Sequence, residues 1–413
     1  MTCKERNYPL YVFFLMMLAL VSCKKDNGNK PGKGIELSLN SVEMQKAEAD
    51  NSFSFNLFKT VAAKAGSSKN LFMSPLSVSM ALGMTSNGAN GGTLTAMDST
   101  LKFKGFSQDD INVYYNKLVT QLPELDPNTT LNIANSIWYE KNFSVLPQFI
   151  STDSSYYHAK VQALDFGAPS SLNTINDWVS RQTSGKIPKM LDQISKDEVM
   201  FLINAIYFKS TWLNKFDPTQ TKKLPFNLPD GGQVSTDFMS GNIKFNSFFY
   251  DNVYGLEMPY SNSKYSMVIV MPSGDKTLND VIAGLNNDTW KSWMSRMSSQ
   301  TNYVTLPKFK FSYDIVLNDA LTTLGMGEAF SQSADFSRIN PSGGLSISQV
   351  KHKAYVAVDE TGTEAAAATS VGIQLTDAAP LIINRPFIFV IREMKTGLIL
   401  FTGTVNNPDQ SGN

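Results

Sequence analysis

The sequence predicts a single large α+β domain over about residues 46–408, and three observations support this. Apolar residues at helical spacing occur early in the chain, whereas short strand-like runs dominate the second half. Apolar runs continue throughout, with no long linker, internal repeat or low-complexity block to divide the chain. Hydrophobic residues make up 42% of the 413 residues and charged residues 17%, which favours a substantial core.

Two early helices are predicted from apolar spacing and from the residues at their ends. In the first, apolar residues recur every three or four positions: Phe55, Leu57, Phe58, Val61 and Ala62. Gly66 ends this segment. In the second, Ser74-Pro75 precedes an apolar stretch over 76–85, and proline at the first helical position fits a helix buried on most faces.

Short apolar runs later in the chain predict buried strands, at 201–208, 266–271 and 304–311. The end of the chain predicts a hairpin, with strands at 387–392 and 398–405 around a Lys-Thr-Gly turn. The stretch between Val358 and Pro386 breaks this pattern, because it is rich in Ala, Thr and Gly and has no basic residue before Arg385. A loop of this length inside a compact domain is uncommon and usually functional.

The N-terminus predicts export and a lipid anchor. Basic residues precede an apolar run of 11 residues, Leu10 to Leu20, which is too short to span a bilayer but suits a signal peptide over residues 1–22. The run ends in Val21-Ser22-Cys23, which resembles a bacterial lipobox, so Cys23 is the expected site of lipid attachment. The alternative is an ordinary signal peptide in which this cysteine has no role.

The anchor hypothesis implies an outer-membrane lipoprotein that faces either the periplasm or the cell surface. Residues 23–45 are expected to form a flexible tether and residues 409–413 a disordered tail. Cys3 and Cys23 are the only cysteines, so the mature domain is expected to fold without disulfides.

Composition and motifs argue against an enzyme. Only His158 and His352 are available as a general base of the commonest type, and no nucleophile elbow, Walker loop, dinucleotide fingerprint or zinc motif is present. Lys+Arg and Asp+Glu both number 36, so no global charge favours nucleic acid. The sequence therefore predicts a protein with no catalytic residues, no metal and no cofactor.

Five blocks of the chain, in order and at matching spacing, resemble the serpin family over nearly all of residues 50–408. They are 70–77 (NLFMSPLS), 175–187 (INDWVSRQTSGKI), 204–212 (NAIYFKSTW), 324–337 (LGMGEAFSQSADFS) and 352–369 (HKAYVAVDETGTEAAAAT). One mild departure is Ser210, where the family usually has glycine.

The resemblance implies a particular fold and a particular activity. The fold is a single domain with a five-stranded main sheet, two further sheets, about eight to nine helices and an exposed reactive-centre loop, here about 360–385. The activity is suicide-substrate inhibition of serine endopeptidases by a monomer: the protease cleaves the loop, and the cut loop inserts into the main sheet and traps the acyl-enzyme. The alternative is a non-inhibitory serpin that binds a partner at the cell surface.

The hinge of that loop has the composition that insertion requires. By resemblance the hinge comprises Glu360, Gly362, Thr363, Glu364, Ala365, Ala366, Ala367, Ala368 and Thr369. In an inserted strand one face points into the core, and the residues on it are small or apolar: Thr363, Ala365, Ala367, Thr369 and Val371. Glu364 and Ser370 fall on the opposite face, which is expected to stay in solvent.

Other residues match named regions of the family. Ser74, Asn204 and His352 correspond to the "shutter", a polar cluster beneath the strands that must separate. Trp212, Lys308 and Glu360 correspond to the "breach", where the loop first enters, with the last two as an ion pair.

The position of the scissile bond is left open between two neighbouring bonds. Counting from Glu360 places it between Thr376 and Asp377, whereas counting back from Pro386 places it between Leu375 and Thr376. Neither bond follows a basic residue, so trypsin-like enzymes fit poorly. The expected targets are elastase-, chymotrypsin- or subtilisin-like enzymes with a pocket for an apolar or small residue, and papain-like cysteine proteases also fit.

Overall fold

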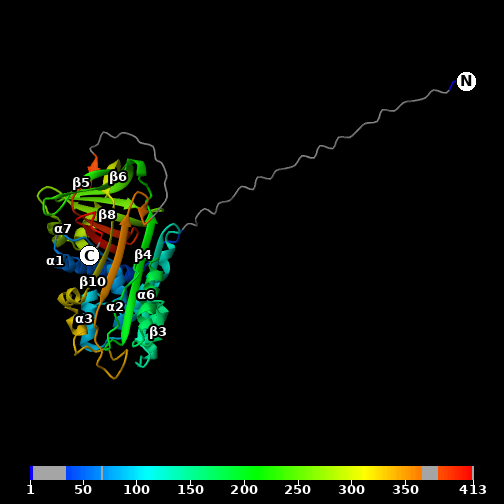
Figure 1. The fold of residues 1–413 in the computed structure, drawn as a ribbon, viewed down its shortest axis with the longest axis vertical. Helices are drawn as coiled ribbons and strands as arrows, with labels where there is room; N and C mark the ends of the chain where they lie inside the picture. The colour runs from blue at the N-terminus through cyan, green and yellow to red at the C-terminus, as the bar shows by residue number, and fades with distance from the viewer. Residues whose placement is uncertain (3–33, 67, 365–379, 412–413) are drawn as a thin grey trace. The chain divides into compact units, whose positions relative to one another are not determined.

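The computed structural model describes residues 1–2, 34–66, 68–364 and 380–411, and the folded part from residue 34 onward is shown in Figure 1. The lipid-attachment candidate Cys23, the hinge residues 365–369 and the scissile-bond candidates 375–377 lie outside the described residues. Among the described residues, no helix is long and apolar enough to cross a bilayer, and no cluster of acidic, histidine or cysteine side chains could hold a metal ion.

Nine α-helices lie within the described ranges, and six of them precede residue 183. They are α1 (Ser41–Ala65), α2 (Pro75–Asn87), α3 (Gly91–Leu101), α4 (Gln108–Gln121), α5 (Pro147–Tyr156), α6 (Pro169–Gln182), α7 (Leu278–Gly284), α8 (Asn287–Ser295) and α9 (Asn318–Leu321). Short helical turns occupy Leu122–Glu124, Pro218–Gln220, Thr322–Met326 and Gly327–Phe330.

The folded domain begins earlier than the sequence predicts. A capping box between Asn40 and Glu43 starts α1 at Ser41, inside the range predicted for the tether. Upstream of the helix, the Ile35 amide donates to the Glu124 carbonyl at 3.1 Å, and Leu37 is fully buried. Leu37, inside the range predicted for the tether, therefore belongs to the core, and the domain starts near residue 34.

The main sheet has five long strands and a two-residue sixth. In spatial order it comprises β10 (Phe309–Val316), β11 (Lys351–Val358), β12 (Gly362–Thr363), β4 (Met200–Thr211), β2 (Thr130–Glu140) and β3 (Lys160–Leu164). Neighbouring strands are antiparallel except β2 and β3, which are parallel. The long, nearly vertical green arrow of β4 in Figure 1 marks this sheet.

The remaining strands form the further sheets that the resemblance implies, and these are continuous with each other. Its order is β1 (Leu71–Met73), β15 (Ile399–Val405), β14 (Phe387–Glu393), β8 (Tyr265–Pro272), β7 (Val253–Pro259), β6 (Gln233–Tyr250), β9 (Ser298–Pro307) and β13 (Leu381–Ile382), with β5 (Lys222–Asn227) also paired to β6. The two expected sheets are joined because β6 is 18 residues long and pairs with β5, β7 and β9.

Most predicted elements are present, and one needs correction. The terminal hairpin forms as β14 and β15. The run 304–311, predicted as one strand, is divided between β9 and β10. Pro307 is the last residue of β9. Lys308, which separates it from β10, still donates its amide to the Asp237 carbonyl of β6 at 2.8 Å.

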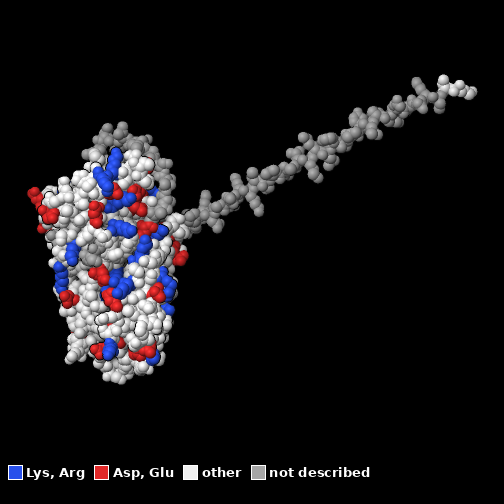
Figure 2. All heavy atoms as spheres, viewed as in Figure 1, with Lys and Arg blue, Asp and Glu red and all other residues white. Residues whose placement is uncertain are grey.

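Each face of the main sheet covers a separate core. On one face, Ile206 and Phe208 of β4 join the large core that includes α1 and α2. On the other face, Ile203 and Ala205 pack with Trp178 of α6 in a smaller core. The two-residue alternation along β4 therefore makes the strand apolar on both sides. On the face seen in Figure 2, basic and acidic side chains are interspersed rather than gathered by sign.

Candidate loop-insertion site in the main sheet

The first residues of the predicted loop already form a strand inside the main sheet. Gly362 and Thr363, as β12, pair with Thr211 and Ser210 of β4, and Thr363 also pairs with Val358 of β11. A Cβ on residue 362 would lie 2.1 Å from the Ser210 carbonyl oxygen, so only glycine allows the backbones to approach this closely. Ser210, the departure from the family pattern, is accommodated because its buried hydroxyl lies 2.6 Å from that of Thr129.

Thr363 is buried in the uncut protein, with 2% of its surface exposed. Its hydroxyl lies 2.7 Å from the Tyr260 hydroxyl, and the Tyr260 ring stacks on Trp212 at 4.6 Å. The Trp212 ring N–H in turn donates to the Asp359 carbonyl at 2.9 Å. The expectation that the whole loop is solvated before cleavage is therefore wrong at Thr363, because β12 has already carried this side chain between two strands.

The predicted ion pair at the breach is formed. The Lys308 Nζ lies 3.0 Å from Glu360 Oε1, which also accepts a hydrogen bond of 2.6 Å from the Thr221 hydroxyl. Partial burial raises the pKa of Glu360, but the hydrogen bonds from Thr221 and Lys308 outweigh it and leave the pKa below its usual value. The carboxylate is thus ionised at neutral pH and fixes the chain at the point where it turns toward the sheet.

Asp359 was not singled out from the sequence, although a local signal was present. Its carboxylate accepts from the amides of Thr361 and Gly362 at 2.8 and 3.2 Å, which closes the turn between β11 and β12. The order Asp-x-x-Gly is a common turn pattern and identifies this role. No such local signal exists for Tyr260, which is distant in the sequence and meets the loop only in the fold.

The Glu364 side chain lies on the predicted side of the strand, opposite Thr363, but it is buried rather than exposed to solvent. Its backbone is left-handed, with φ of 57°, and its side chain is 4% exposed rather than in solvent. Oε2 accepts a hydrogen bond of 2.7 Å from the Tyr207 hydroxyl, and Lys186 Nζ lies 3.7 Å from Oε1. Burial raises the pKa of Glu364 despite these partners. The side chain points away from Thr363 as predicted, but it is covered by residues of β4 and of the segment after α6.

The shutter residues lie on three elements and are linked through α2. Ser74 caps α2, donates its amide to His352 Nε2 at 3.1 Å, and donates its hydroxyl to the Leu400 carbonyl at 2.7 Å. Asn204 of β4 accepts from the hydroxyl of Ser77, also on α2. Burial lowers the pKa of His352 to about 4, so the ring is neutral at pH 7 and can accept the Ser74 amide.

Asn135 of β2 completes this network and was not predicted. It accepts a hydrogen bond of 2.7 Å from the Asn204 amide and donates to the Tyr157 carbonyl at 2.7 Å. His352 on β11 and Asn204 on β4 are therefore each held by α2, and no hydrogen bond joins these two side chains to each other.

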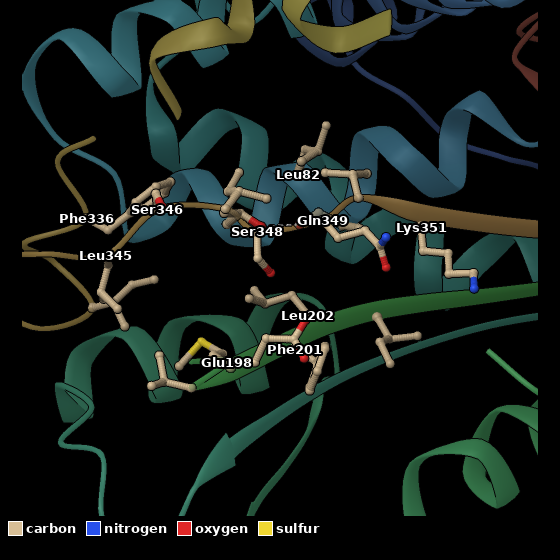
Figure 3. Close-up of a pocket in the computed structure, with 18 of the residues that line it drawn as sticks. Leu82, Glu198, Phe201, Leu202, Phe336, Leu345, Ser346, Ser348, Gln349 and Lys351 are labelled. Atoms are coloured by element: carbon tan, nitrogen blue, oxygen red, sulfur yellow. Dashed lines mark hydrogen bonds between the residues drawn. The ribbon is translucent and has the colours of Figure 1, made fainter. Parts of the chain in front are cut away.

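Below β12 the main sheet is parted over a cavity. The described residues of β4 and β11 form no ladder with each other, and a cavity of about 480 Å³ lies between residues 197–204 and 343–352. Figure 3 shows Phe201 and Leu202 on one side of the cavity and Gln349 and Lys351 on the other, with Leu82 of α2 on the same side as Gln349. Asn204 and His352 also line this cavity. A strand that continued from β12 would enter this gap.

Comparison with known proteins agrees with this geometry. A family model described as "Serpin (serine protease inhibitor)" matches residues 48–408. The leukocyte elastase inhibitor of Xenopus laevis is 35% identical over 374 residues, which cover 86% of this chain and 97% of that protein.

Two solved structures show the same fold at similar levels of identity. The thermophilic serpin tengpin in its native state superposes with a TM-score of 0.81 at 33% identity, covering 90% of this chain and 95% of that one. A complex of thyroxine-binding globulin with thyroxine gives a TM-score of 0.81 at 30% identity, covering 89% of this chain and all of that one. The chain belongs to the serpin family, whose members are generally protease inhibitors rather than enzymes.

Proposed function

We propose that this protein is a suicide-substrate inhibitor of an endopeptidase. The observation that carries the proposal is the state of the main sheet: Gly362–Thr363 is seated between β11 and β4, and directly below it these strands are unpaired over a cavity. A further strand can therefore enter without first breaking a ladder between β4 and β11.

In the proposed mechanism the protease carries out the bond cleavage, and this chain supplies the conformational change that traps the enzyme. The nucleophile of the enzyme attacks the scissile carbonyl carbon, the C–N bond breaks, and the departing amine takes a proton, which leaves an acyl-enzyme on the upstream part of the loop. Inserting roughly a dozen residues forms ladder hydrogen bonds of about 0.5–1.5 kcal/mol each, on the order of 10 kcal/mol in all. That free energy is available to drag the attached enzyme and distort its active site.

Insertion beyond β12 has an identifiable first step. Glu364 must leave its left-handed conformation for an extended one, and its contacts with Tyr207 and Lys186 must be remade or lost. The next core-facing positions, Ala365 and Ala367, present only methyl groups to the gap. Small apolar side chains at these positions support insertion, because a charged one would be buried without a partner.

The parted strands are also prepared for separation by their contacts with α2. His352 on β11 is bonded to Ser74, and Asn204 on β4 is bonded to Ser77. Because each strand is tied to the helix and not to the other strand, widening the gap does not require a polar contact between β4 and β11 to be broken.

We further propose that the target cleaves after an apolar or small residue. Cleavage is expected between Leu375 and Thr376 or between Thr376 and Asp377, and no basic residue lies between Lys353 and Arg385. Elastase-, chymotrypsin- and subtilisin-like serine proteases match this loop, as do papain-like cysteine proteases that prefer leucine in their second pocket. The leukocyte elastase inhibitor among the relatives supports the first class.

One experiment separates inhibition from the alternative of non-inhibitory binding. The purified domain is mixed with chymotrypsin, elastase, subtilisin and papain, with trypsin as the mismatched control, and each mixture is run on a denaturing gel. An SDS-resistant complex with a matched protease supports the proposal, and mass spectrometry of the released peptide locates the cut. The proposal would be contradicted if every matched enzyme cleaved the protein completely without forming a complex. It would also be contradicted if the trapped protein were cleaved only at the bond after Arg385.

A non-inhibitory member of the fold remains the second candidate, since thyroxine-binding globulin shares it. In non-inhibitory members the core-facing hinge positions usually carry proline or charge, and here neither occurs at Thr363, Ala365, Ala367 or Thr369. The hinge composition therefore favours the inhibitor.

We also propose that the protein is exported and held at the outer membrane by a lipid on Cys23, on the basis of the lipobox-like sequence before it.

A further inference from the structure

A second hollow lies at the opposite end of α1 from the capped N-terminus, and none of the shutter or breach residues lines it. It has a volume of about 320 Å³ and is bounded by the end of α1, the start of α7, a turn before β6 and the segment that leads into β14. Helices α1 and α7 are neighbours on the left of Figure 1. Apolar side chains form its walls: Ala62, Leu71, Pro272, Leu278, Ile282 and Pro386.

One positive charge beside this hollow is not compensated by an acidic side chain among the described residues. Two cations line it, Lys276 and Arg385, and no acidic side chain does. Lys276 is neutralised from outside, because its Nζ lies 2.6 Å from Asp251 Oδ2. The Arg385 guanidinium is exposed and forms no ion pair or hydrogen bond with any residue that the structure describes. One free guanidinium therefore stands beside an apolar hollow.

We propose that this hollow, which we call the α1–α7 pocket, binds an apolar monocarboxylate of the size of a medium-chain fatty acid. Pockets for small ligands are mostly apolar with a few polar groups that fix orientation, and volumes of about 300 Å³ and above are typical. A guanidinium pairs with a carboxylate through two parallel hydrogen bonds, which gives Arg385 the orienting role. The hydrocarbon body would lie against Leu278 and Ile282, where it leaves water.

This site is separate from the place where the loop is proposed to insert. None of its lining residues belongs to β4, β11 or β12, and none lines the cavity below the parted strands. Arg385 lies just after β13, where the loop returns to the body of the protein, and the Asn384 carbonyl there accepts hydrogen bonds of 2.8 and 3.1 Å from Asn227. The return segment is therefore held in place, and the guanidinium is presented from a fixed backbone.

The test is direct titration of the uncut protein with sodium octanoate, using calorimetry, with 1-octanol as a neutral probe of the same length. We expect one saturable site for octanoate and about tenfold weaker binding of octanol. Arg385→Gln should weaken octanoate about tenfold and leave octanol unchanged, because only the charge-assisted contact is lost. Ile282→Trp should abolish the binding of both probes by filling the pocket.

Arg338→Gln is the matched control, since Arg338 is also an exposed arginine but lies outside the pocket. It should bind octanoate like the wild type. All variants are first compared by thermal unfolding to confirm that they are folded. Octanoate that fails to saturate on the wild type, or that binds Arg385→Gln as tightly as the wild type, would overturn the proposal. Neither outcome bears on whether the protein traps a protease.

Discussion

The hydroxyl groups of Thr363 and Tyr260 lie 2.7 Å apart inside the main sheet of the uncut protein. In the proposed mechanism, this contact gives insertion a structural starting point before any protease acts. It also determines which hinge residues can be used to test insertion, because a side chain that is already buried affects the native state as well as the trap.

Thr363→Arg should destabilise the uncut protein. A guanidinium at this position must enter the sheet without a partner or pull β12 out of it, at a cost of several kcal/mol. We expect a clearly lower thermal midpoint, whereas Thr363→Val, which keeps the shape and loses one hydrogen bond, should cost about 1 kcal/mol. Equal midpoints for the arginine variant and the wild type would show that Thr363 is not held in the sheet.

Ala367→Arg should convert the inhibitor into a substrate without this loss of stability. Residue 367 shares a strand face with Thr363 by the two-residue period and must be buried on insertion. Slow insertion allows the acyl-enzyme to be hydrolysed first, so the stoichiometry of inhibition should rise well above one. Ala368→Arg is the control on the opposite face and should trap nearly as well as the wild type. If both variants trap equally well, the inserted register is different.

The breach pair should contribute little to stability on its own. Lys308 is about one-third exposed, and an ion pair in this setting is worth about 0–1 kcal/mol. A double-mutant cycle with Lys308→Met and Glu360→Gln, followed by thermal unfolding, should give a coupling energy within that range. The single change Glu360→Gln should have a larger effect on the rate of trapping, because Glu360 also holds Thr221 at the turn. A coupling energy of several kcal/mol would contradict the positioning role.

His352 should make the protein less stable in mild acid. In the unfolded chain this histidine binds a proton below about pH 6.5, whereas burial keeps it neutral in the folded protein down to about pH 4. The unfolded state therefore gains protons first as pH falls, and stability should drop across this window by up to about 3 kcal/mol. His352→Gln lacks this titration, so the difference between variant and wild type should change between pH 6.5 and 4. If the difference in unfolding free energy between variant and wild type were the same at every pH, the titration of His352 would not contribute to stability.

Cys23→Ala should release the protein from membranes. Cys23 is the only cysteine left after removal of the predicted signal peptide, and thioether attachment of lipid requires its sulfur. We expect the variant in the soluble fraction and in the aqueous phase of a detergent partition, with wild-type protein in the membrane fraction. Unchanged partitioning would mean that another element anchors the chain.

Local sequence was enough to predict the elements whose signals are local, and the family blocks supplied the rest of the fold. The Ser74-Pro75 start of α2 and the terminal hairpin follow from capping and turn chemistry. The start of the domain was placed too late, because Ile35 and Leu37 give no periodic pattern. Leu37 is buried, and the Ile35 amide is bonded, only through contacts with segments far away in the sequence. The composition of residues 359–385 identified the loop but not where it meets the sheet.

Within the site, the errors share one physical cause. Alternation correctly placed Thr363 and Glu364 on opposite faces, but alternation says nothing about what covers each face. Burial of Glu364 depends on Tyr207 and Lys186, and burial of Thr363 depends on Tyr260, and these contacts join residues far apart in the chain. Such contacts are set by tertiary packing and cannot be obtained from the spacing of residues within the loop.

The gap between β4 and β11 also allows loop insertion to be followed by amide hydrogen exchange. Alternate amides of β4 and β11 face the gap below β12, where the described strands offer them no ladder partner. Those amides should exchange their protons for deuterium readily in the uncut protein, while amides on the paired edge of the same strands exchange slowly. Once a cleaved loop occupies the gap, the fast set should become protected from the β12 end downward. Pulsed deuterium labelling at different times after protease addition would show which amides of β4 and β11 have become protected. It would thus follow the advance of the incoming strand without a probe attached to the protein.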